Sequence, residues 1–146
     1  MLTKLENKLH SQIPMTKLIQ LHVKTINNGK LITTAPLEIN INDKGTGFAG
    51  SLSTIVTISA WSACFLKTDE LGYKTPMIAV IKSDTSYRAP VTKDIYCETI
   101  LPTKEELELV KKKLETKGSA SLKVKSKIVE EGKTCVDFEG IYVIKV

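Results

Sequence analysis

The residues best suited to chemistry lie in one short segment, 40–52, which contains three glycines and precedes a long apolar run. A glycine-rich turn that opens a helix lets several backbone N–H groups point at one oxygen, and the helix dipole adds positive potential there. We therefore predict an oxyanion site built from the N–H groups near Phe48, Ala49 and Gly50.

Asn42 adds a neutral donor and acceptor to the same segment, because a carboxamide does not titrate near neutral pH. Such donors stabilise the charge that develops when a carbonyl is attacked or becomes an enolate, and the loss of one donor costs about 2.7 to 4 kcal/mol of barrier. The alternative interpretation is that Asn42 and the glycines only shape a turn.

The elements before this segment are predicted from periodicity and turn residues. A short helix is expected over 3–12, and a strand over 17–26 with Ile19, Leu21 and Val23 on one face. Asn and Gly residues at 27–29 tolerate positive φ, so they predict a tight hairpin into a second strand over 30–37.

The elements after the segment complete an α+β pattern. Residues 51–71 alternate locally like a strand, but the length of the run favours a buried helix that Gly72 ends. A continuous apolar run over 77–81 is suited to a central strand, and another strand is expected over 94–101.

Thr103 and Glu106 form a capping-box pair, which predicts a helix that runs to about Lys117. Two final strands are expected over 122–128 and 136–143, with Gly140 as a bulge. The order of these elements predicts one domain over residues 1–146, in which an antiparallel sheet wraps a long helix.

Composition narrows the functional classes. The chain has 146 residues, 42% of them apolar, and a formal charge of +5 that favours an acidic partner. Neither a membrane span nor a secretory signal fits the sequence, so we expect a cytoplasmic protein. Cys64, Cys97 and Cys135 lack paired spacing and are expected to be reduced, and with only two histidines we expect no metal and no cofactor.

Asn42, Gly45, Thr46 and Gly50 match the pattern Asn-x-x-Gly-Thr-x-x-x-Gly, which resembles the loop that opens the central helix of hotdog-fold acyl thioesterases. A longer stretch, with Ala35-Pro36-Leu37, Trp61 and the segment Ser83 to Asp94, resembles the C-terminal hotdog domain of YiiD-type thioesterases over residues 14–145. The resemblance implies a hotdog fold and a thioester substrate carried by coenzyme A or acyl carrier protein. It also implies a homodimer or a dimer of dimers, because hotdog sheets join edge to edge.

The resemblance also suggests which residues form the site. Catalytic roles fall to Asn42, Gly50 and Thr57, and substrate binding falls to Asp43, Gly45, Thr46, Phe48, Ala49, Ser51, Ser83 and Tyr87. Three positions depart from the pattern: Asp43 replaces a frequent His, Ala49 replaces Gly, and Thr57 stands where many thioesterases place an acid. Because a hydroxyl is no base at neutral pH without an activating neighbour, the base for hydrolysis would come from Asp43, Asp84 or Asp94.

Hydrolysis of an acyl thioester is the first functional prediction, and two alternatives stay open. Decarboxylation of a malonyl-carrier thioester needs a stabilised enolate oxygen but no protein base, and YiiD-type domains have been associated with it. A noncatalytic acyl-binding protein would also lack the helix acid.

Nucleic-acid binding is disfavoured because only 5% of residues are aromatic and no known module is present. Seven lysines form a basic stripe that contacts phosphates or is simply solvated: Lys111, Lys112, Lys113, Lys117, Lys123, Lys125 and Lys127.

Overall fold

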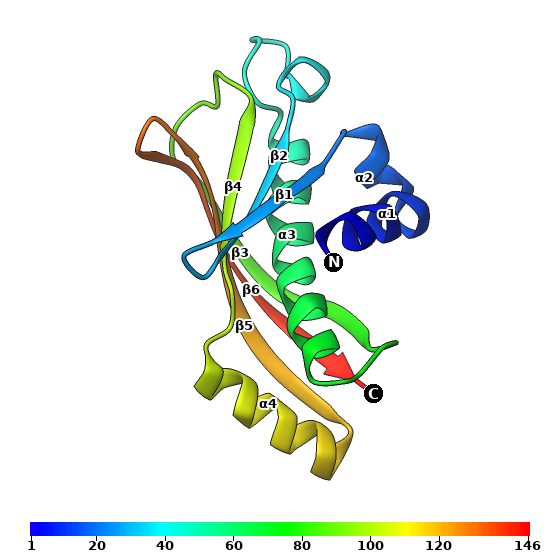
Figure 1. Cartoon of the computed structure of the whole chain (residues 1–146). Coiled ribbons are helices and arrows are strands. Elements are labelled where there is room, and N and C mark those ends of the chain that lie inside the picture. The colour runs from blue at the N-terminus through cyan, green and yellow to red at the C-terminus, as the bar shows by residue number, and fades with distance from the viewer.

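The computed structural model describes residues 1–146 as a six-stranded antiparallel sheet curved around one long helix (Figure 1). The elements, in chain order, are α1 (Leu2–Gln12), α2 (Pro14–Leu18), β1 (His22–Asn27), β2 (Lys30–Ala35), η1 (Glu38–Asn40), α3 (Ala49–Glu70), β3 (Met77–Tyr87), β4 (Ile95–Ile100), α4 (Lys104–Lys117), β5 (Ser119–Glu130) and β6 (Lys133–Lys145). The predicted α+β layout, with an antiparallel sheet around a buried helix, is confirmed.

The strands lie in the order β1-β2-β4-β5-β6-β3, and every neighbouring pair is antiparallel. The β1–β2 hairpin turns at Asn28 and Gly29, whose φ values are 51° and 73°. The β5–β6 hairpin turns at Glu131 and Gly132, with φ values of 50° and 77°. Each turn contains a glycine, which adopts positive φ readily, and the first turn was predicted from the Asn and Gly residues at 27–29.

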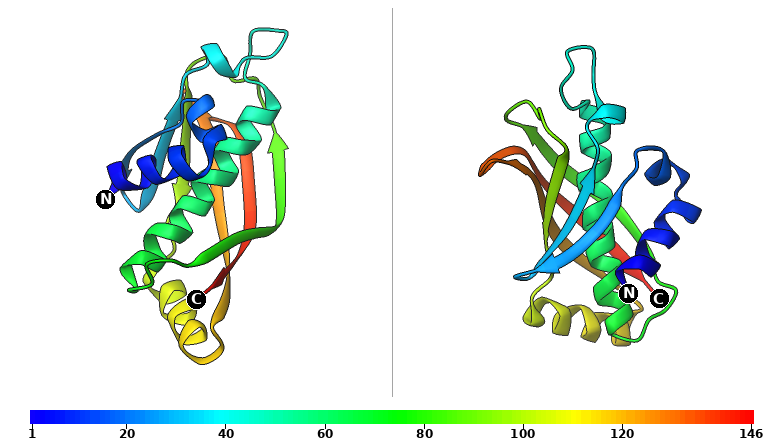
Figure 2. Two further views of the ribbon diagram at one scale, coloured as in Figure 1. Left: turned by 90° about the vertical axis from the view of Figure 1, so that its right-hand side faces the viewer. Right: turned by 45° about the horizontal axis from the view of Figure 1, so that its top comes forward.

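Helix α3 is the centre of the core. Twelve of its 22 residues are buried, because the sheet packs against one side and α1 against another (Figures 1 and 2). By length and by a mean hydropathy of 1.4, α3 is also apolar enough to cross a membrane. Burial inside the fold accounts for that composition, since a core helix must be apolar on most sides.

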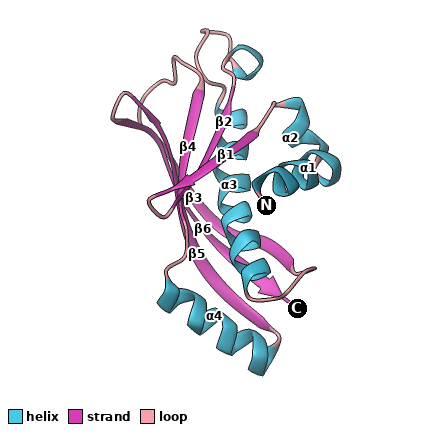
Figure 3. Cartoon of the chain, in the orientation of Figure 1, coloured by secondary structure: helices cyan, strands magenta, loops and turns pink.

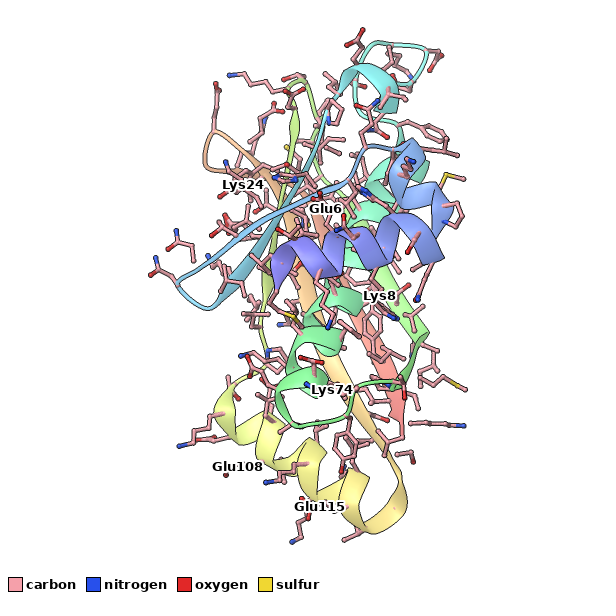
Figure 4. All side chains as sticks on the ribbon, turned by 45° about the vertical axis from the view of Figure 1, so that its right-hand side comes forward. Glu6, Lys8, Lys24, Lys74, Glu108 and Glu115 are labelled. Carbon is pink, nitrogen blue, oxygen red and sulfur yellow. The ribbon has the colours of Figure 1, made fainter.

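Two helices cover the remaining surfaces of the core. Leu5 and Leu9 of α1 are buried against it, and Lys8 places its Nζ 5.2 Å from the centre of the Phe65 ring on α3 (Figure 4). Helix α4 lies against β5 at one end of the sheet (Figure 3). Its predicted capping box is confirmed, with the Glu106 N–H donating to Thr103 Oγ1 at 3.1 Å.

The first strand is shorter than predicted. Residues 17 and 18 belong to α2, which begins at Pro14, and Gln20 then turns the chain with a φ of 58°. Proline is well suited to the first turn of a helix, so the segment adds a helical turn before β1 begins at His22. Ile19, Leu21 and Val23 are nonetheless all buried, as the predicted face requires.

Strand β3 differs more from the prediction, because it is an edge strand and not a central one. It continues to Tyr87 and pairs only with β6 (Figure 2). Most of its side chains are exposed. The bulge predicted at Gly140 is also wrong, since the register shifts in β3 between Val80 and Lys82 instead. A Cβ at Gly140 would lie 2.8 Å from the rings of Phe138 and Tyr142, so close packing explains this glycine.

A row of buried polar groups ties α3 to the sheet. The hydroxyl of Ser59 on α3 lies 2.7 Å from that of Thr33 on β2, and Thr99 and Ser126 form a second 2.7 Å pair between β4 and β5. Cys97 lies within the row. Because a buried hydroxyl without a partner is costly, these pairs favour one register of the helix against the sheet.

Candidate active site

Three backbone N–H groups at the start of α3 have no partner within the chain. The N-cap residue Phe48 makes no side-chain cap, and the first intrahelical bond runs from the Leu52 N–H to the Phe48 carbonyl at 3.0 Å. The N–H groups of Ala49, Gly50 and Ser51 are therefore free to bind an oxygen, and the positive end of the helix dipole lies there.

The donor set is shifted by one residue from the prediction. The Phe48 N–H donates to the Asn40 carbonyl at 2.7 Å, so it is not free to bind a ligand. The Gly47 N–H is also engaged, with the Val91 carbonyl at 2.8 Å. These two bonds anchor the loop to η1 and to the segment after β3, and the free donors begin at Ala49.

The Phe48 ring packs closely over residue 50. A Cβ at Gly50 would lie 2.5 Å from Cε2 of that ring, a distance that real side chains do not adopt. The ring is half-exposed and covers the Cα of Gly50 in the first turn of the helix. Phe48 and Gly50 therefore form one packing unit beside the free N–H groups.

Asn42 uses its carboxamide to shape the loop. Its Oδ1 accepts from the N–H groups of Lys44 at 2.8 Å and Thr46 at 3.1 Å. Its Nδ2 donates to Thr46 Oγ1 at 2.9 Å, and its own N–H donates to the Thr46 carbonyl at 2.8 Å. This network corresponds to the turn-shaping interpretation, and a direct role of Asn42 on a substrate stays a prediction.

A groove of about 330 Å³ lies beside the free N–H groups. Tyr87, from the end of β3, places its Oη 3.5 Å from the Ala49 carbonyl at the groove wall. The groove combines an apolar floor with a few polar groups, as small-molecule sites do. Its lining residues are Asn42, Lys44, Thr46, Gly47, Ala49, Leu52, Tyr87, Arg88, Ala89, Pro90 and Val91.

Lys44 and Arg88 line the groove, and no carboxylate does. The Arg88 guanidinium is paired with Asp137, at 3.3 Å from Nη2 to Oδ2. Asp43 is highly exposed and lies 3.5 Å from Lys44 Nζ. Asp84 lies on the opposite face of the sheet, and Asp94 accepts the Leu37 N–H at 3.0 Å. None of the three carboxylates considered as a base lines the groove.

The remaining predicted site residues occupy different places. Ser51 is buried in the first turn of α3, and Gly45, with a φ of 78°, forms the loop tip. Thr57 donates its hydroxyl to the Ser53 carbonyl at 2.7 Å, so within one chain it does not face the groove as a free group. Ser83 lies on the exposed edge strand β3, opposite Gly140 of β6, and it does not line the groove.

Asn40 begins the 40–52 segment but was assigned no role from the sequence, and the structure shows that it positions the site. It is 1% exposed, and its Nδ2 donates to the Ile19 and Pro36 carbonyls at 3.0 and 2.8 Å. Its backbone carbonyl accepts the Phe48 N–H, so Asn40 links α2, β2 and the cap of α3. A polar residue two positions before Asn42 was the available signal.

No group of three or more His, Cys, Asp or Glu side chains is placed to hold a metal ion. All three cysteines are free and buried, as predicted. Burial raises the pKa of Cys97 to about 11, although hydrogen bonds with Ser59, Thr33 and Thr99 oppose the effect. A thiol in this state is a poor nucleophile at neutral pH.

The fold and the site together define a hotdog-fold protein of thioesterase type. The chain belongs to the family described as "Putative thioesterase (yiiD_Cterm)", whose model matches residues 2–146. No curated protein matches the chain significantly in sequence.

Solved structures support the same assignment. A thioesterase from Shewanella oneidensis, itself described as putative, is 29% identical with a TM-score of 0.87, and the match covers 99% of this chain and 96% of that one. A Chlorobaculum tepidum protein of unknown function is 32% identical with a TM-score of 0.91, covering 98% and 93%. A Haemophilus influenzae thioesterase, 10% identical with a TM-score of 0.72 over 99% and 90%, shares the fold.

Proposed function

We propose that this protein hydrolyses acyl thioesters of coenzyme A or acyl carrier protein in the groove at the start of α3. The observation that carries the proposal is the set of unpartnered N–H groups of Ala49, Gly50 and Ser51 beside that groove. A thioester carbonyl oxygen bound there would gain negative charge in the transition state, where such donors act most strongly.

In the proposed reaction, a water oxygen bonds to the thioester carbon and the carbonyl electron pair moves to the oxygen held by the helix. When the carbonyl reforms, the carbon–sulfur bond breaks, the thiol takes the proton lost by water, and a carboxylic acid is left. Lys44 at the groove favours a substrate with anionic groups, which both proposed carriers provide.

Decarboxylation of a malonyl thioester is a second candidate, and the absence of carboxylates from the groove lining favours it. In this reaction the bond between the carboxylate and C2 breaks, carbon dioxide leaves, and the electron pair forms an enolate whose oxygen the same N–H groups hold. Water then protonates C2 to give an acetyl thioester. No protein base is needed for the bond-breaking step.

We infer that the working form is a homodimer joined through β3. This strand has a free edge, and its exposed apolar residues include Met77, Val80 and Ile81. A long, exposed and apolar strand edge is a site for pairing with another chain. The groove residue Tyr87 belongs to the same strand, so pairing would bring a second subunit beside the groove.

Mass spectrometry after incubation with acetyl and malonyl thioesters of both carriers distinguishes the candidates. Release of the free carrier thiol supports hydrolysis, and conversion of the malonyl to the acetyl thioester supports decarboxylation. If no acyl thioester changes while a non-hydrolysable acyl analogue binds, the protein is a noncatalytic acyl-binding protein and the enzyme proposal is rejected.

A further inference from the structure

The charges on β3 select one register for pairing with a second copy. Lys82 and Asp84 point to the same face of the sheet, since they oppose Ile141 and Glu139 on β6. In an antiparallel pair about a two-fold axis, placing Ser83 on the axis sets each Lys82 opposite the partner's Asp84. A shift of two residues either way would oppose Lys82 to Lys82 or Asp84 to Asp84, which is destabilising.

This register determines what lies beside the groove. With Ser83 on the axis, Tyr87 of one subunit is level with residues 78–80 of the partner subunit's β3, on strands about 4.8 Å apart. The register shift between Val80 and Lys82 turns Ile78 and Val80 to the α3 face, because they oppose the buried Ile144 and Tyr142. Tyr87 opposes the buried Val136 on β6, so its side chain is on the face of the sheet that carries α3. Residues of α3 near Ile78 in the partner subunit therefore lie close to Tyr87 across the proposed strand pair.

Trp61 is the α3 residue hydrogen-bonded to this part of β3. Its indole Nε1 donates to the carbonyl of Ile78 at 3.0 Å. Its ring stacks on Phe65 with centroids 5.5 Å apart and an interplanar angle of 4°. Unlike Phe65, Trp61 is not fully buried within its own subunit, so part of its rigid apolar ring is left for a partner to contact.

We propose that the partner subunit's Trp61 closes the open side of the groove and limits the length of the acyl group that the site accepts. The inference rests on the proposed thioester chemistry for its activity readout. An acyl chain that leaves the N–H groups of α3 along Tyr87 would meet the indole of the other subunit. Each groove of the dimer is then complete only with a residue from both chains.

The homodimeric Trp61→Ala variant should accept longer chains, so the ratio of kcat/KM for an octanoyl over an acetyl thioester should rise at least ~10-fold. Trp61→Phe keeps an aromatic wall and is the matched control, with a ratio expected within about 3-fold of the wild type. A thermal melt shows whether each variant is folded. An unchanged ratio in a folded Trp61→Ala dimer would overturn the proposal.

A mixed dimer shows whether the Trp61 that limits acyl length belongs to the same chain as the groove or to the partner subunit. One subunit carries Trp61→Ala, and the other carries Gly50→Val, which we expect to inactivate that subunit's own site because a Cβ at residue 50 would lie 2.5 Å from the Phe48 ring. The one active groove then belongs to the Trp61→Ala chain but faces an intact tryptophan in trans. Wild-type chain-length preference is expected, and the preference of the Trp61→Ala homodimer would contradict the proposal.

The same mixed dimer is informative even if the wild type hydrolyses nothing, which would reject the proposed function separately. The chain has one tryptophan, so this dimer contains a single indole. A brominated, non-hydrolysable acyl thioether should quench its emission on binding, because the open groove lies beside that indole. Binding without quenching would place Trp61 outside the groove of the other subunit.

Discussion

At the scale of single residues, the account depends on how the loop leaves three N–H groups free at the start of α3. Asn42 and Asn40 act by holding the backbone, one within the loop and one beneath the cap. Phe48 and Gly50 act by contact, because the ring occupies the space of a Cβ.

Gly50→Ala should lower kcat/KM at least ~10-fold, because its Cβ displaces the Phe48 ring, which lies beside the free N–H groups. Removing the ring as well, in Phe48→Ala with Gly50→Ala, should restore part of the loss. Steady-state kinetics of the two single variants and the double variant measure this coupling. Additive losses in the double variant would show that the ring and the glycine act independently.

Asn42→Asp should keep more activity than Asn42→Ala, because the aspartate retains an oxygen that accepts the Lys44 and Thr46 N–H groups. We expect Asn42→Ala to lower the melting temperature of the protein and its turnover together. If Asn42→Asp lost all turnover while keeping the wild-type melting temperature, Asn42 would instead donate to the substrate through Nδ2.

At the scale of elements, the features predicted correctly were those that depend on residues close together in the sequence. The capping box of α4 and the Asn28-Gly29 turn depend on neighbours within a few residues, so sequence alone located them. The position of β3 could not be predicted, because an apolar run reads the same whether its own sheet or a second chain covers it. The hydrogen bond of the Phe48 N–H could not be predicted either, since its acceptor, the Asn40 carbonyl, comes from η1.

The inferred register of β3 predicts a charge-swap series. Lys82→Glu should raise the dimer dissociation constant roughly 10-fold at low salt, because it sets two acidic pairs across the axis. Adding Asp84→Lys should restore dimerisation by reversing both pairs. Lys123→Glu, on the same face but within the sheet, is the control and should leave dimerisation unchanged.

Sedimentation velocity over a range of protein concentrations measures these constants. Equal dimerisation of Lys82→Glu and wild type, or no recovery in the double variant, would rule out the register centred on Ser83. High salt should reduce the differences among the variants, because exposed charges are screened over about 10 Å at 0.1 M.

At the scale of the whole molecule, the buried thiol of Cys97 links stability to pH. Its pKa is raised from an ordinary 9.0 to about 11, chiefly by burial, so the folded state holds the proton more tightly than the unfolded state. The associated stability is fully present below about pH 9 and is lost as pH rises through 11. The loss is on the order of 2 to 3 kcal/mol at that limit.

Cys97→Ser should therefore show a shallower fall in the free energy of unfolding between pH 8.5 and about 10.5 than the wild type. A serine hydroxyl fits the buried row beside Thr33 and Ser59 and does not titrate in this range. Urea unfolding followed by circular dichroism gives the comparison. Parallel curves for the two proteins would show that Cys97 contributes nothing to the alkaline transition.

The central claim is that the N–H groups of Ala49, Gly50 and Ser51 bind the carbonyl oxygen of an acyl thioester, and amide NMR tests it directly. Titration of the ¹⁵N-labelled protein with an acyl analogue in which a ketone replaces the thioester should shift these three amide resonances downfield, saturably and together. Saturable binding that leaves all three resonances in place would contradict the account.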